Sequence, residues 1–546
     1  MMKFLRLLGE WGAVATDLVS SIAPVDWVSL LAAIIVILIF LKLHQHGTRR
    51  RSSKLQQHKL PPGPRPWPLV GCMLQVNDLP HKWFANLAST YGPILYLHMG
   101  SLPYVIVNNA QMAKEVLKTH DMEFASRPRS MLGEVISFGY EDIVFRSSDA
   151  KWRALRKICA SNLFTPSGLK TTTALRQEDM LFMVHCIHAA AKSRSIVNVK
   201  RVIHEANLNT MCSMLFGKRY FRADGKLDSE GKSFLDLLDL LVAESGQLNL
   251  GDFIPALKWL DLQRAEKRLR KDLKQALEKF FFSKLAENRK LHCTNKLLDG
   301  KESHLLDFLQ SLKGKESLSD KTIAGILCDL VLAGTDTTSV TAEWALSEIL
   351  ANPHILHKAQ EEIASVVGQE RLVQESDLVN LPYLQAIVRE TLRLHPALPL
   401  GIPHYNSVAT HLAGYTIPAG STLLINISAI GRDPANWSHP TQFNPDRFLG
   451  SDIQLVGEHF HLIPFSAGRR FCLGYPLVIV QVPHVLAALL QTFDWSLPAG
   501  KRPEDISMQE KIGLACYRAV PLEAVASCRF PAAPYLSKLS ENIQGS

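Results

Sequence analysis

The hydrophobic pattern changes character about 44 residues into the chain, and most of the remaining sequence has the periodicity of α-helices. Before that point, a nearly uninterrupted apolar run extends from Trp27 to Leu43. After it, apolar residues recur every three or four positions over long stretches, a spacing that places them on one face of a helix. This period predicts a final helix that starts near Gly474 and earlier helices over residues 150–165, 173–193, 230–247, 262–290, 318–351, 353–367 and 381–395.

Segments with the character of β-strands are short and lie in two regions. Residues 93–100 and 104–107 are rich in β-branched and aromatic side chains and predict two strands joined by a short turn. Two more strands are predicted around residues 414–418 and 422–426. Because the strands are few and separate from the helices, we expect a mainly α (α+β) fold with small β-sheets, not a doubly wound sheet.

Length and composition are those of a globular protein with a large core. The chain has 546 residues, of which 47% are hydrophobic and 20% charged, and it has no evident internal repeat or low-complexity tract. No second linker follows the Pro-rich stretch that ends near residue 68. We therefore expect one large domain over residues 69–546.

The apolar run of residues 27–43 predicts an uncleaved transmembrane helix. Its apolar core is slightly shorter than the roughly 20 residues of an ideal spanning helix, but Trp27 and Lys42 can lie at the headgroups and extend its reach. A cleaved signal peptide is the main alternative, and no convincing small-residue cleavage site follows the run. The second alternative is that the run forms a helix buried in the protein core. Residues 1–26 form an N-terminal extension to which the sequence assigns no role.

The excess of positive charge is concentrated just after this run. The net charge is +9, and a basic run can indicate nucleic acid, a membrane surface or a solvated tail. Because it follows an apolar span, we interpret it as the flank that keeps the rest of the chain in the cytosol, with no nucleic-acid partner. Residues 44–68 thus form a basic and Pro-rich linker, whose prolines favour a semi-rigid extended spacer. Its basic residues are Arg49, Arg50, Arg51, Lys54, Lys59 and Arg65.

The nine cysteines give no support to a zinc or dithiol site, because they form no C-x-x-C pair. Cys472 differs from the others, since it lies between two glycines and directly before a helix in the segment FSAGRRFCLG. Free N–H groups and the dipole at a helix start favour a thiolate there, and Arg469 and Arg470 add positive charge. A stabilised thiolate can be a nucleophile, a zinc ligand or a haem ligand. Neither a neighbouring histidine base nor further zinc ligands are obvious.

A second unusual segment lies within the helix predicted over residues 318–351. Residues 333–338 read AGTDTT, and a glycine with three threonines lowers helix propensity in the middle of a long helix. Threonine hydroxyls can also bond to the preceding turn and bend the helix. We expect a distortion there, although a polar kink in a long helix is often only structural.

The segment from Phe465 to Gly474 fits the pattern F-x-x-G-x-R-x-C-x-G, through which the chain resembles the cytochrome P-450 superfamily. The resemblance implies heme b as the cofactor, with Cys472 as the axial ligand of the iron. It further implies that Arg470 binds a haem propionate, that Phe465 packs beside the sulfur and that Gly474 belongs to the cofactor loop. A thiolate ligand pushes electron density onto the iron and favours O–O cleavage.

Residues 333–337 resemble the oxygen-activation segment [AG]-G-x-[DE]-T of the same family. This implies that the Thr337 hydroxyl assists oxygen activation and that Asp336 gates proton delivery. An intact pair of acid and alcohol favours monooxygenation driven by an NADPH-cytochrome reductase over rearrangement of peroxides without external electrons.

Three further motifs extend the resemblance. Glu390 and Arg393 in E-T-L-R, with Arg447 in a second motif that carries Asp446 where Glu is more usual, imply a buried structural charge network. The helix motif W-R-x-x-R implies that Trp152 and Arg156 lie at the haem edge. His404 stands where the family has Arg or His, which implies another propionate contact, although a lone histidine in a loop is more often a surface residue.

Within the superfamily the chain is most similar to plant microsomal members, and residues 252–261 and 518–522 are loosely similar to flavonoid B-ring hydroxylases. The likeness implies a single-pass protein of the endoplasmic reticulum membrane that oxidises a small hydrophobic, aromatic or phenolic substrate with dioxygen. The segments expected to face the substrate are 130–135, 327–337, 398–403 and 511–514. Their largely apolar lining does not discriminate among a flavonoid, a terpene and a fatty acid.

One departure from the family pattern lies in the helix after Cys472. Pro483 stands in its interior, among β-branched residues, and an interior proline costs a helix about 3 kcal/mol. We predict a kink near residue 479 and a less firmly held cysteine loop. The alternative function is therefore a non-catalytic haem-binding membrane scaffold for a metabolic enzyme complex.

Overall fold

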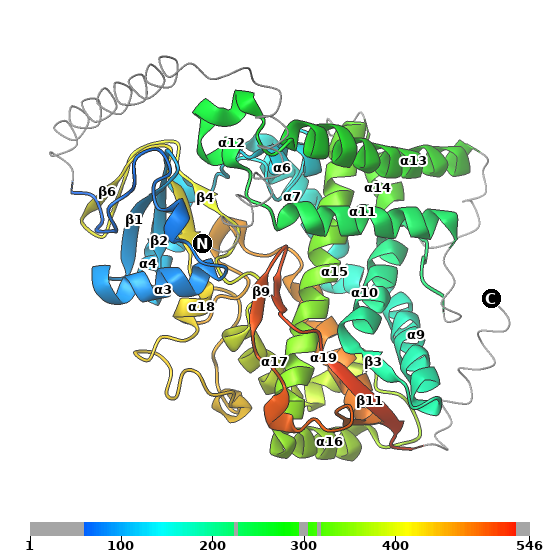
Figure 1. Cartoon of the computed structure of the whole chain (residues 1–546). Helices are drawn as coiled ribbons and strands as arrows, with labels where there is room; N and C mark the ends of the chain where they lie inside the picture. Colours follow the sequence, from blue (N-terminus) through cyan, green and yellow to red (C-terminus); the bar gives the residue numbers. More distant parts are fainter. Residues whose placement is uncertain (1–58, 223–227, 294–303, 314–317, 531–546) are drawn as a thin grey trace, which may run out of the picture.

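The structure is a computed structural model, and it describes residues 59–222, 228–293, 304–313 and 318–530 (Figure 1). The predicted extension of residues 1–26, the predicted anchor of residues 27–43 and most of the linker lie outside the described residues. Within the described part, two helices are long and apolar enough to cross a membrane, α15 (Asp320–Ala351) and α19 (Tyr475–Thr492), and most of each is buried inside the body.

The helices predicted from the apolar period are present close to their expected bounds. The region predicted as one helix over residues 262–290 begins as a π-helix, η4 (Glu266–Leu273), and continues as α13 (Lys274–Cys293). Besides α15 and α19, the long predicted helices are α7 (Ala150–Leu163), α9 (Thr173–Lys192), α11 (Ser229–Ser245), α16 (Pro353–Val367) and α17 (Pro382–Leu394).

The remaining helices are mostly short, and the apolar period did not predict them. The α-helices are α3 (Pro80–Tyr91), α4 (Ala110–Lys114), α5 (Asp121–Phe124), α6 (Met131–Ile136), α8 (Pro166–Thr171), α12 (Leu250–Phe253), α14 (Leu305–Ser311) and α18 (Ile427–Ile430). The 3₁₀- and π-helical turns are η1 (Met73–Gln75), η2 (Glu115–Thr119), η3 (Pro255–Leu260), η5 (Glu375–Asn380), η6 (Pro445–Phe448), η7 (Gly468–Arg470) and η8 (Pro503–Asp505).

One long helix, α10 (Val199–Phe216), also escaped the sequence prediction. It is capped by Asn198, whose side chain accepts a hydrogen bond from the Arg201 N–H, and it ends at Gly217 in the left-handed conformation. Most of α10 is buried, yet its buried faces carry polar residues such as Asn207, Asn209 and Thr210. Polar side chains that satisfy one another inside the protein interrupt the apolar period, so the pattern does not reveal this helix.

The strands form small sheets, in agreement with the predicted α+β class. The largest has the order β1-β2-β7-β4, in which β2 and β7 are parallel and the other pairs antiparallel. The others have the orders β3-β11-β8, β10-β9 and β5-β6. The strands are β1 (Ile94–Met99), β2 (Leu102–Val107), β3 (Ile196–Asn198), β4 (His404–Tyr405), β5 (Thr410–Leu412), β6 (Tyr415–Ile417), β7 (Thr422–Ile425), β8 (Phe493–Ser496), β9 (Glu510–Ile512), β10 (Cys516–Arg518) and β11 (Glu523–Cys528).

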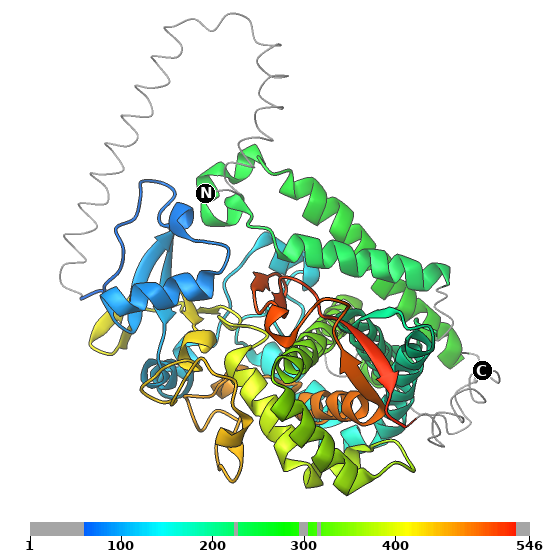
Figure 2. The same ribbon diagram turned by 60° about the horizontal axis from the view of Figure 1, so that its bottom comes forward.

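The helices and the largest sheet occupy different parts of the molecule. Figures 1 and 2 both place β1, β2 and α3 at one side and the long helices at the other, with α15 running through the helical part. The described part of the predicted linker lies along that sheet, where the Pro62 carbonyl accepts a hydrogen bond from the Tyr96 N–H at 2.9 Å. A Cβ on Gly63 would stand 1.9 Å from the Tyr96 carbonyl oxygen, so this approach requires glycine.

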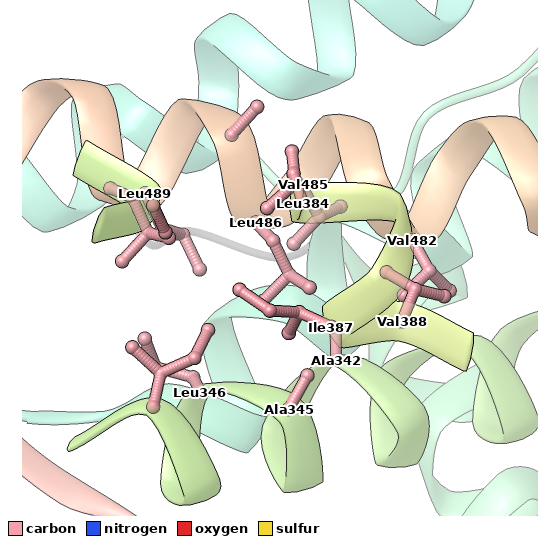
Figure 3. Close-up of a cluster of buried hydrophobic side chains, with 14 of the residues drawn as sticks. Ala342, Ala345, Leu346, Leu384, Ile387, Val388, Val482, Val485, Leu486 and Leu489 are labelled. Atoms are coloured by element: carbon pink, nitrogen blue, oxygen red, sulfur yellow. The ribbon is translucent and has the colours of Figure 1, made fainter. Parts of the chain in front are cut away.

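Helix α15 joins two hydrophobic clusters. Its N-terminal half, including Ile323 and Leu327, packs in one cluster with α6, α10 and α13. Its C-terminal half packs in another with α16, α17 and α19. The polar segment of residues 333–339 belongs to neither cluster. In Figure 3 the second cluster is built from Ala342, Ala345 and Leu346 of α15, Leu384, Ile387 and Val388 of α17, and Val482, Val485, Leu486 and Leu489 of α19.

Helix α19 remains an uninterrupted α-helix across Pro483. The proline is buried, and the residues on either side of it, Val482 and His484, are buried too. The helix is therefore fixed by apolar packing on α15 and α17, which offsets the cost of the missing backbone N–H. A change of axis direction near Ile479 stays a prediction.

Candidate active site

Cys472 lies in a tight loop between η7 and α19. Gly468, at the start of η7, has φ +67°, and a Cβ there would stand 2.1 Å from the Leu117 carbonyl oxygen, so only glycine fits. The Cys472 N–H donates to the Phe465 carbonyl oxygen at 3.0 Å and closes the loop. Gly474 is the N-cap of α19, so Cys472 stands two residues before that cap.

The Cys472 sulfur experiences two opposing effects. Burial raises the pKa of this thiol, whereas the backbone N–H groups of Gly474 and Tyr475 and the charge of Arg156 lower it. The net pKa is raised. The sequence predicted the N–H donors at the helix start but not the dominant effect of burial, which depends on the surrounding fold. A bound cation at the sulfur would reverse this balance, because a metal-coordinated thiol loses its proton.

Phe465 and Gly474 complete the cysteine loop. The Phe465 ring meets the Tyr475 ring edge to face, with centroids 5.1 Å apart. Gly474 has φ −78°, which any residue can adopt. Of the two glycines on either side of Cys472, only Gly468 is therefore required by its backbone conformation. A Cβ on Gly474 would stand 3.9 Å from the Cys472 sulfur, an ordinary contact on the side of the thiol.

A buried cationic cluster lies beside this loop. Arg470 donates from Nε to the Ala125 carbonyl oxygen at 2.6 Å and from Nη1 to the Ile143 carbonyl oxygen at 3.1 Å, and its Nη2 donates to the Arg146 carbonyl oxygen. Its guanidinium carbon is 4.1 Å from the centroid of the buried Trp152 ring. Arg156, one turn further along α7, donates from Nη2 to the Phe471 carbonyl oxygen.

Arg127 belongs to the same cluster, although no sequence motif marked it as a functional residue. Its Nη1 donates to the carbonyl oxygens of Ile402 and Pro403 at 2.8 and 2.7 Å, which ties it to the chain leading into β4. Only 6% of this arginine is exposed. It follows α5 in a loop without periodicity, so nothing in the hydrophobic pattern marks it as buried.

The charges of this cluster are incompletely neutralised by the described residues. Burial lowers the pKa of Arg127 well below its usual value, and the neighbouring charge of Arg470 lowers it further. Burial and Arg156 likewise lower the pKa of Arg470, to about 10, although Asp142 opposes the shift. A guanidinium has five N–H donors, and the three carbonyls bonded to Arg470 use three of them. Such a cluster fits an anionic ligand with acceptor oxygens.

His404 faces the same cluster from β4. Its Nδ1–H donates to the Phe124 carbonyl oxygen at 3.0 Å, which leaves Nε2 as an acceptor in the neutral ring. Burial and the charges of Arg127 and Arg470 lower its pKa to about 3, so the ring is neutral near pH 7. The side chain is buried, not a surface loop histidine. It can donate from Nε2 to a carboxylate only when an added negative charge favours the imidazolium.

Asp336 and Thr337 lie on α15 between the two hydrophobic clusters. The helix is continuous there, so the predicted distortion does not interrupt it, but the Thr337 hydroxyl donates to the Ala333 carbonyl oxygen at 2.6 Å. Asp336 is buried. Its Oδ2 accepts a hydrogen bond from the Tyr517 hydroxyl, and its Oδ1 lies 4.0 Å from His204 Nε2. These two partners were not predicted.

The structure brings Glu390, Arg393 and Arg447 together as the sequence motifs led us to expect. Arg393 bonds both Glu390 oxygens at 2.7 Å, and Arg447 Nε bonds Oε1 at 3.0 Å. Both Glu390 and Arg393 are fully buried. Arg393 also donates to the carbonyl oxygens of Gly431 and Pro440, so the network fixes α17 to the loop that precedes η6.

One of the segments expected to face a substrate with a largely apolar lining also carries a buried acid. Within residues 327–337, Asp329 accepts hydrogen bonds from the N–H groups of Ile143 and Val144 at 2.9 and 3.0 Å. Burial raises its pKa, and the neighbouring carboxyl of Asp142 raises it further. Asp329 therefore supports the loop in which the Ile143 carbonyl oxygen accepts from Arg470 and the Val144 carbonyl oxygen accepts from Arg127 Nε at 3.2 Å.

Comparison with known proteins assigns this architecture to a family. Residues 61–519 match the family model of cytochrome P450. The chain is 38% identical to flavonoid 3'-monooxygenase of Petunia hybrida, over 93% of this chain and 99% of that protein. It is 36% identical to cytochrome P450 98A1 of Sorghum bicolor, over 87% and 93% of the two chains. A zebra fish cytochrome P450 solved with progesterone has a TM-score of 0.70 and 27% identity, and the match covers 82% of this chain and 99% of that one.

The chain therefore belongs to the cytochrome P450 family. It is a haem-thiolate monooxygenase, an oxidoreductase with haem as its cofactor, and the predicted fold class is confirmed. The buried cations with spare N–H donors suit the two propionates of that cofactor, and the loop of Cys472 supplies a sulfur at the start of a helix. When bound, the haem supplies the activation of dioxygen.

Proposed function

We propose that Cys472 is the axial ligand of the haem iron and that Arg470, Arg156, His404 and Trp152 hold the propionate edge. The support is the convergence of this sulfur with a buried cationic cluster whose donors the described residues only partly use. Arg127 joins the set because it is buried and its charge acts on the pKa of His404, as the charge of Arg470 acts on its own pKa. Phe465 and Gly474 line the sulfur, and Thr337 and Asp336 supply the hydroxyl and the proton for oxygen activation.

The proposed reaction is hydroxylation of a small phenolic or other aromatic substrate, driven by an NADPH-cytochrome reductase. The support is the intact pair of Asp336 and Thr337 together with the flavonoid hydroxylases among the relatives. We further propose that residues 27–43 anchor the protein in the endoplasmic reticulum membrane with residues 69–546 in the cytosol. The continuity of α19 across Pro483 supports the catalytic function over a non-catalytic scaffold.

The test uses the full chain expressed in microsomes with the reductase. The reduced protein under carbon monoxide is expected to show the red-shifted Soret band of thiolate ligation. A panel of flavonoids with one hydroxyl on the B ring, supplied with NADPH and isotopically labelled dioxygen, is expected to yield a product with one labelled oxygen atom.

Cys472→Ala should abolish both the band and the product, because the sulfur is lost. Cys528→Ala, which alters a distant free cysteine on β11, is the matched control and should preserve them. Persistence of the red-shifted band in Cys472→Ala would contradict the ligand assignment. A normal band without NADPH consumption across the panel would favour the scaffold.

A further inference from the structure

The buried carboxylate of Asp336 is joined to a cluster of titratable side chains from neighbouring elements. Tyr517 of β10 donates its hydroxyl proton to Oδ2, and His204 of α10 places Nε2 at 4.0 Å from Oδ1. Figure 1 shows α10 and the hairpin that contains β9 and β10 beside α15. Only 8% of the Asp336 side chain is exposed, against 27% for His204. His204 is therefore the more solvent-accessible of the two side chains.

Charged groups from three elements face His204. Burial lowers its pKa and so does Lys200 on the same helix, whereas Asp336 of α15 and Asp239 of α11 raise it. Lys200 also lies over the Tyr517 ring, with Nζ 3.8 Å from the centroid. The imidazole thus has negative charge both toward the interior and toward solvent, where Asp239 is exposed. A histidine in this setting can exchange a proton with either side.

Tyr517 has a different role in the cluster. Burial raises its pKa, and the nearby charge of Asp336 raises it further. The phenol therefore keeps its proton and acts as a hydrogen-bond donor to Oδ2. This bond fixes the carboxylate so that Oδ1 remains on the side of His204.

We infer that His204 is the relay that passes protons from solvent to Asp336, and that Tyr517 positions the carboxylate to receive them. The inference rests on the proposed function, because inserting one oxygen atom of dioxygen and releasing the other as water consumes two electrons and two protons per turnover. The reductase supplies the electrons. The protons must reach a carboxylate that is itself buried.

Each relay step conserves protons. A solvent proton binds the neutral His204 ring, and the imidazolium then transfers a proton to Asp336 Oδ1, directly after a small rotation or through one water across the gap of 4.0 Å. The ring returns to its neutral form and takes the next proton from solvent. The proton then resides on Asp336. This residue is adjacent on α15 to Thr337, whose hydroxyl is proposed to assist oxygen activation.

The first test measures protonation and requires no turnover. Carbethoxylation of His204 by diethyl pyrocarbonate, which reacts with neutral imidazole, is followed against pH in the full-length haem protein by peptide mass spectrometry. Asp336→Asn should shift the reaction of His204 to lower pH, because the charge that favours the imidazolium is gone. An unchanged titration in Asp336→Asn would overturn the electrostatic contact on which the relay depends.

The second test measures catalysis with the substrate and product found in the flavonoid panel. His204→Phe should lower kcat about tenfold, within the range of proton-transfer contributions, with KM unchanged. It should divert NADPH from product to hydrogen peroxide, flatten the pH profile of kcat and enlarge the solvent deuterium isotope effect. His185→Phe removes a partly buried histidine from the neighbouring helix α9 and should behave like the wild type.

The outcomes separate the relay from the proposed function. Absence of product from the wild-type protein would refute the proposed function, whatever His204 does. A productive wild type with an unaltered coupling ratio and pH profile in His204→Phe would refute the relay alone. A defect confined to Tyr517→Phe would overturn the assignment of the relay to His204. The carbon monoxide spectrum of each variant shows that it retains a folded haem site.

Discussion

At the scale of single residues, His404 shows how a buried cluster sets the chemistry of one side chain. Its hydrogen bond to Phe124 fixes the tautomer, and its burial beside Arg127 and Arg470 keeps the ring neutral. A propionate placed against Nε2 would reverse that preference, because an adjacent negative charge favours the imidazolium. The same side chain can therefore be neutral without the haem and a donor with it.

We expect His404→Leu to lose haem faster than the wild type. A hydrogen bond to a charged group contributes about 1.5–3 kcal/mol, so transfer of haem to an excess of apomyoglobin should accelerate roughly tenfold or more. His404→Arg should restore retention, because a guanidinium supplies the donor. His411→Leu, which changes an exposed histidine on β5, is the control. Equal transfer rates for all four proteins would exclude a propionate contact by His404.

At the scale of elements, Glu510 ties the hairpin of β9 and β10 to α3. Its carboxylate lies 3.0 Å from His81 Nε2 and 2.8 Å from Lys82 Nζ, and Arg432 Nη2 is at 3.7 Å. Burial raises the pKa of Glu510, but hydrogen bonds from His81 and Lys82 outweigh that effect and lower it to about 2. Only 5% of the side chain is exposed. The ionised Glu510 carboxylate and its partners therefore stabilise the fold at neutral pH.

We expect Glu510→Gln to be destabilised by about 3 kcal/mol at pH 7, from the shift between the ordinary and folded pKa. A lowered folded pKa gives stability that is fully present above the unfolded value and lost as the pH falls through the folded value. The difference between wild type and variant should therefore shrink between about pH 4.5 and pH 2. Urea midpoints of both proteins across this range provide the measurement.

Glu504→Gln, in an exposed turn, is the control for this titration and should follow the wild type. A wild-type advantage over Glu510→Gln that stays constant down to pH 2 would show that the stabilisation does not depend on the ionised carboxylate.

At the scale of the whole molecule, a buried polar chain joins three long helices. Gln481 of α19 donates to the Asn207 side-chain oxygen at 2.8 Å, and Asn207 of α10 donates to the Ser339 hydroxyl at 3.0 Å. Ser339 in turn donates to the Thr335 carbonyl oxygen of α15 at 2.7 Å. This chain connects the helix after Cys472 to the helix that carries Asp336 and Thr337.

Removing one member of this hydrogen-bonded chain of side chains should lower the free energy of unfolding, because a buried partner is left unsatisfied. Removing two bonded members together should cost less than the sum of the two single losses. Asn207→Leu leaves the Gln481 amide N–H without its acceptor, at about 1–3 kcal/mol for one unsatisfied group. The Ser339 hydroxyl loses the Asn207 donor but keeps its own hydrogen bond to the Thr335 carbonyl oxygen. Gln481→Leu leaves one acceptor unsatisfied. The double variant should therefore be less destabilised than the sum of the single variants, by about 0.5–3 kcal/mol. Urea denaturation of the four proteins measures this coupling, and strict additivity would mean that the helices are joined by apolar packing alone.

The sequence determined the elements whose signal is local. The apolar period predicted α9, α15, α16 and α17, because these helices bury one face against the core. The β-branched and aromatic residues on either side of a short turn predicted β1 and β2. The cysteine loop and the pair of Asp336 and Thr337 stand in contiguous motifs, so their residue types and spacing could be recognised without a structure.

Only the tertiary structure decided the rest. Helix α10 lacks a clear apolar period, because buried polar side chains such as Asn207 and Thr210 stand on its inner faces and bond to other helices. Arg127, His204 and Tyr517 gain their significance from partners far along the chain, and burial reverses the pKa expected for Cys472 from its position before a helix. The intact α19 across Pro483 depends on α15 and α17. Hydrogen bonds, burial and charge act through space, and separation along the chain does not encode them.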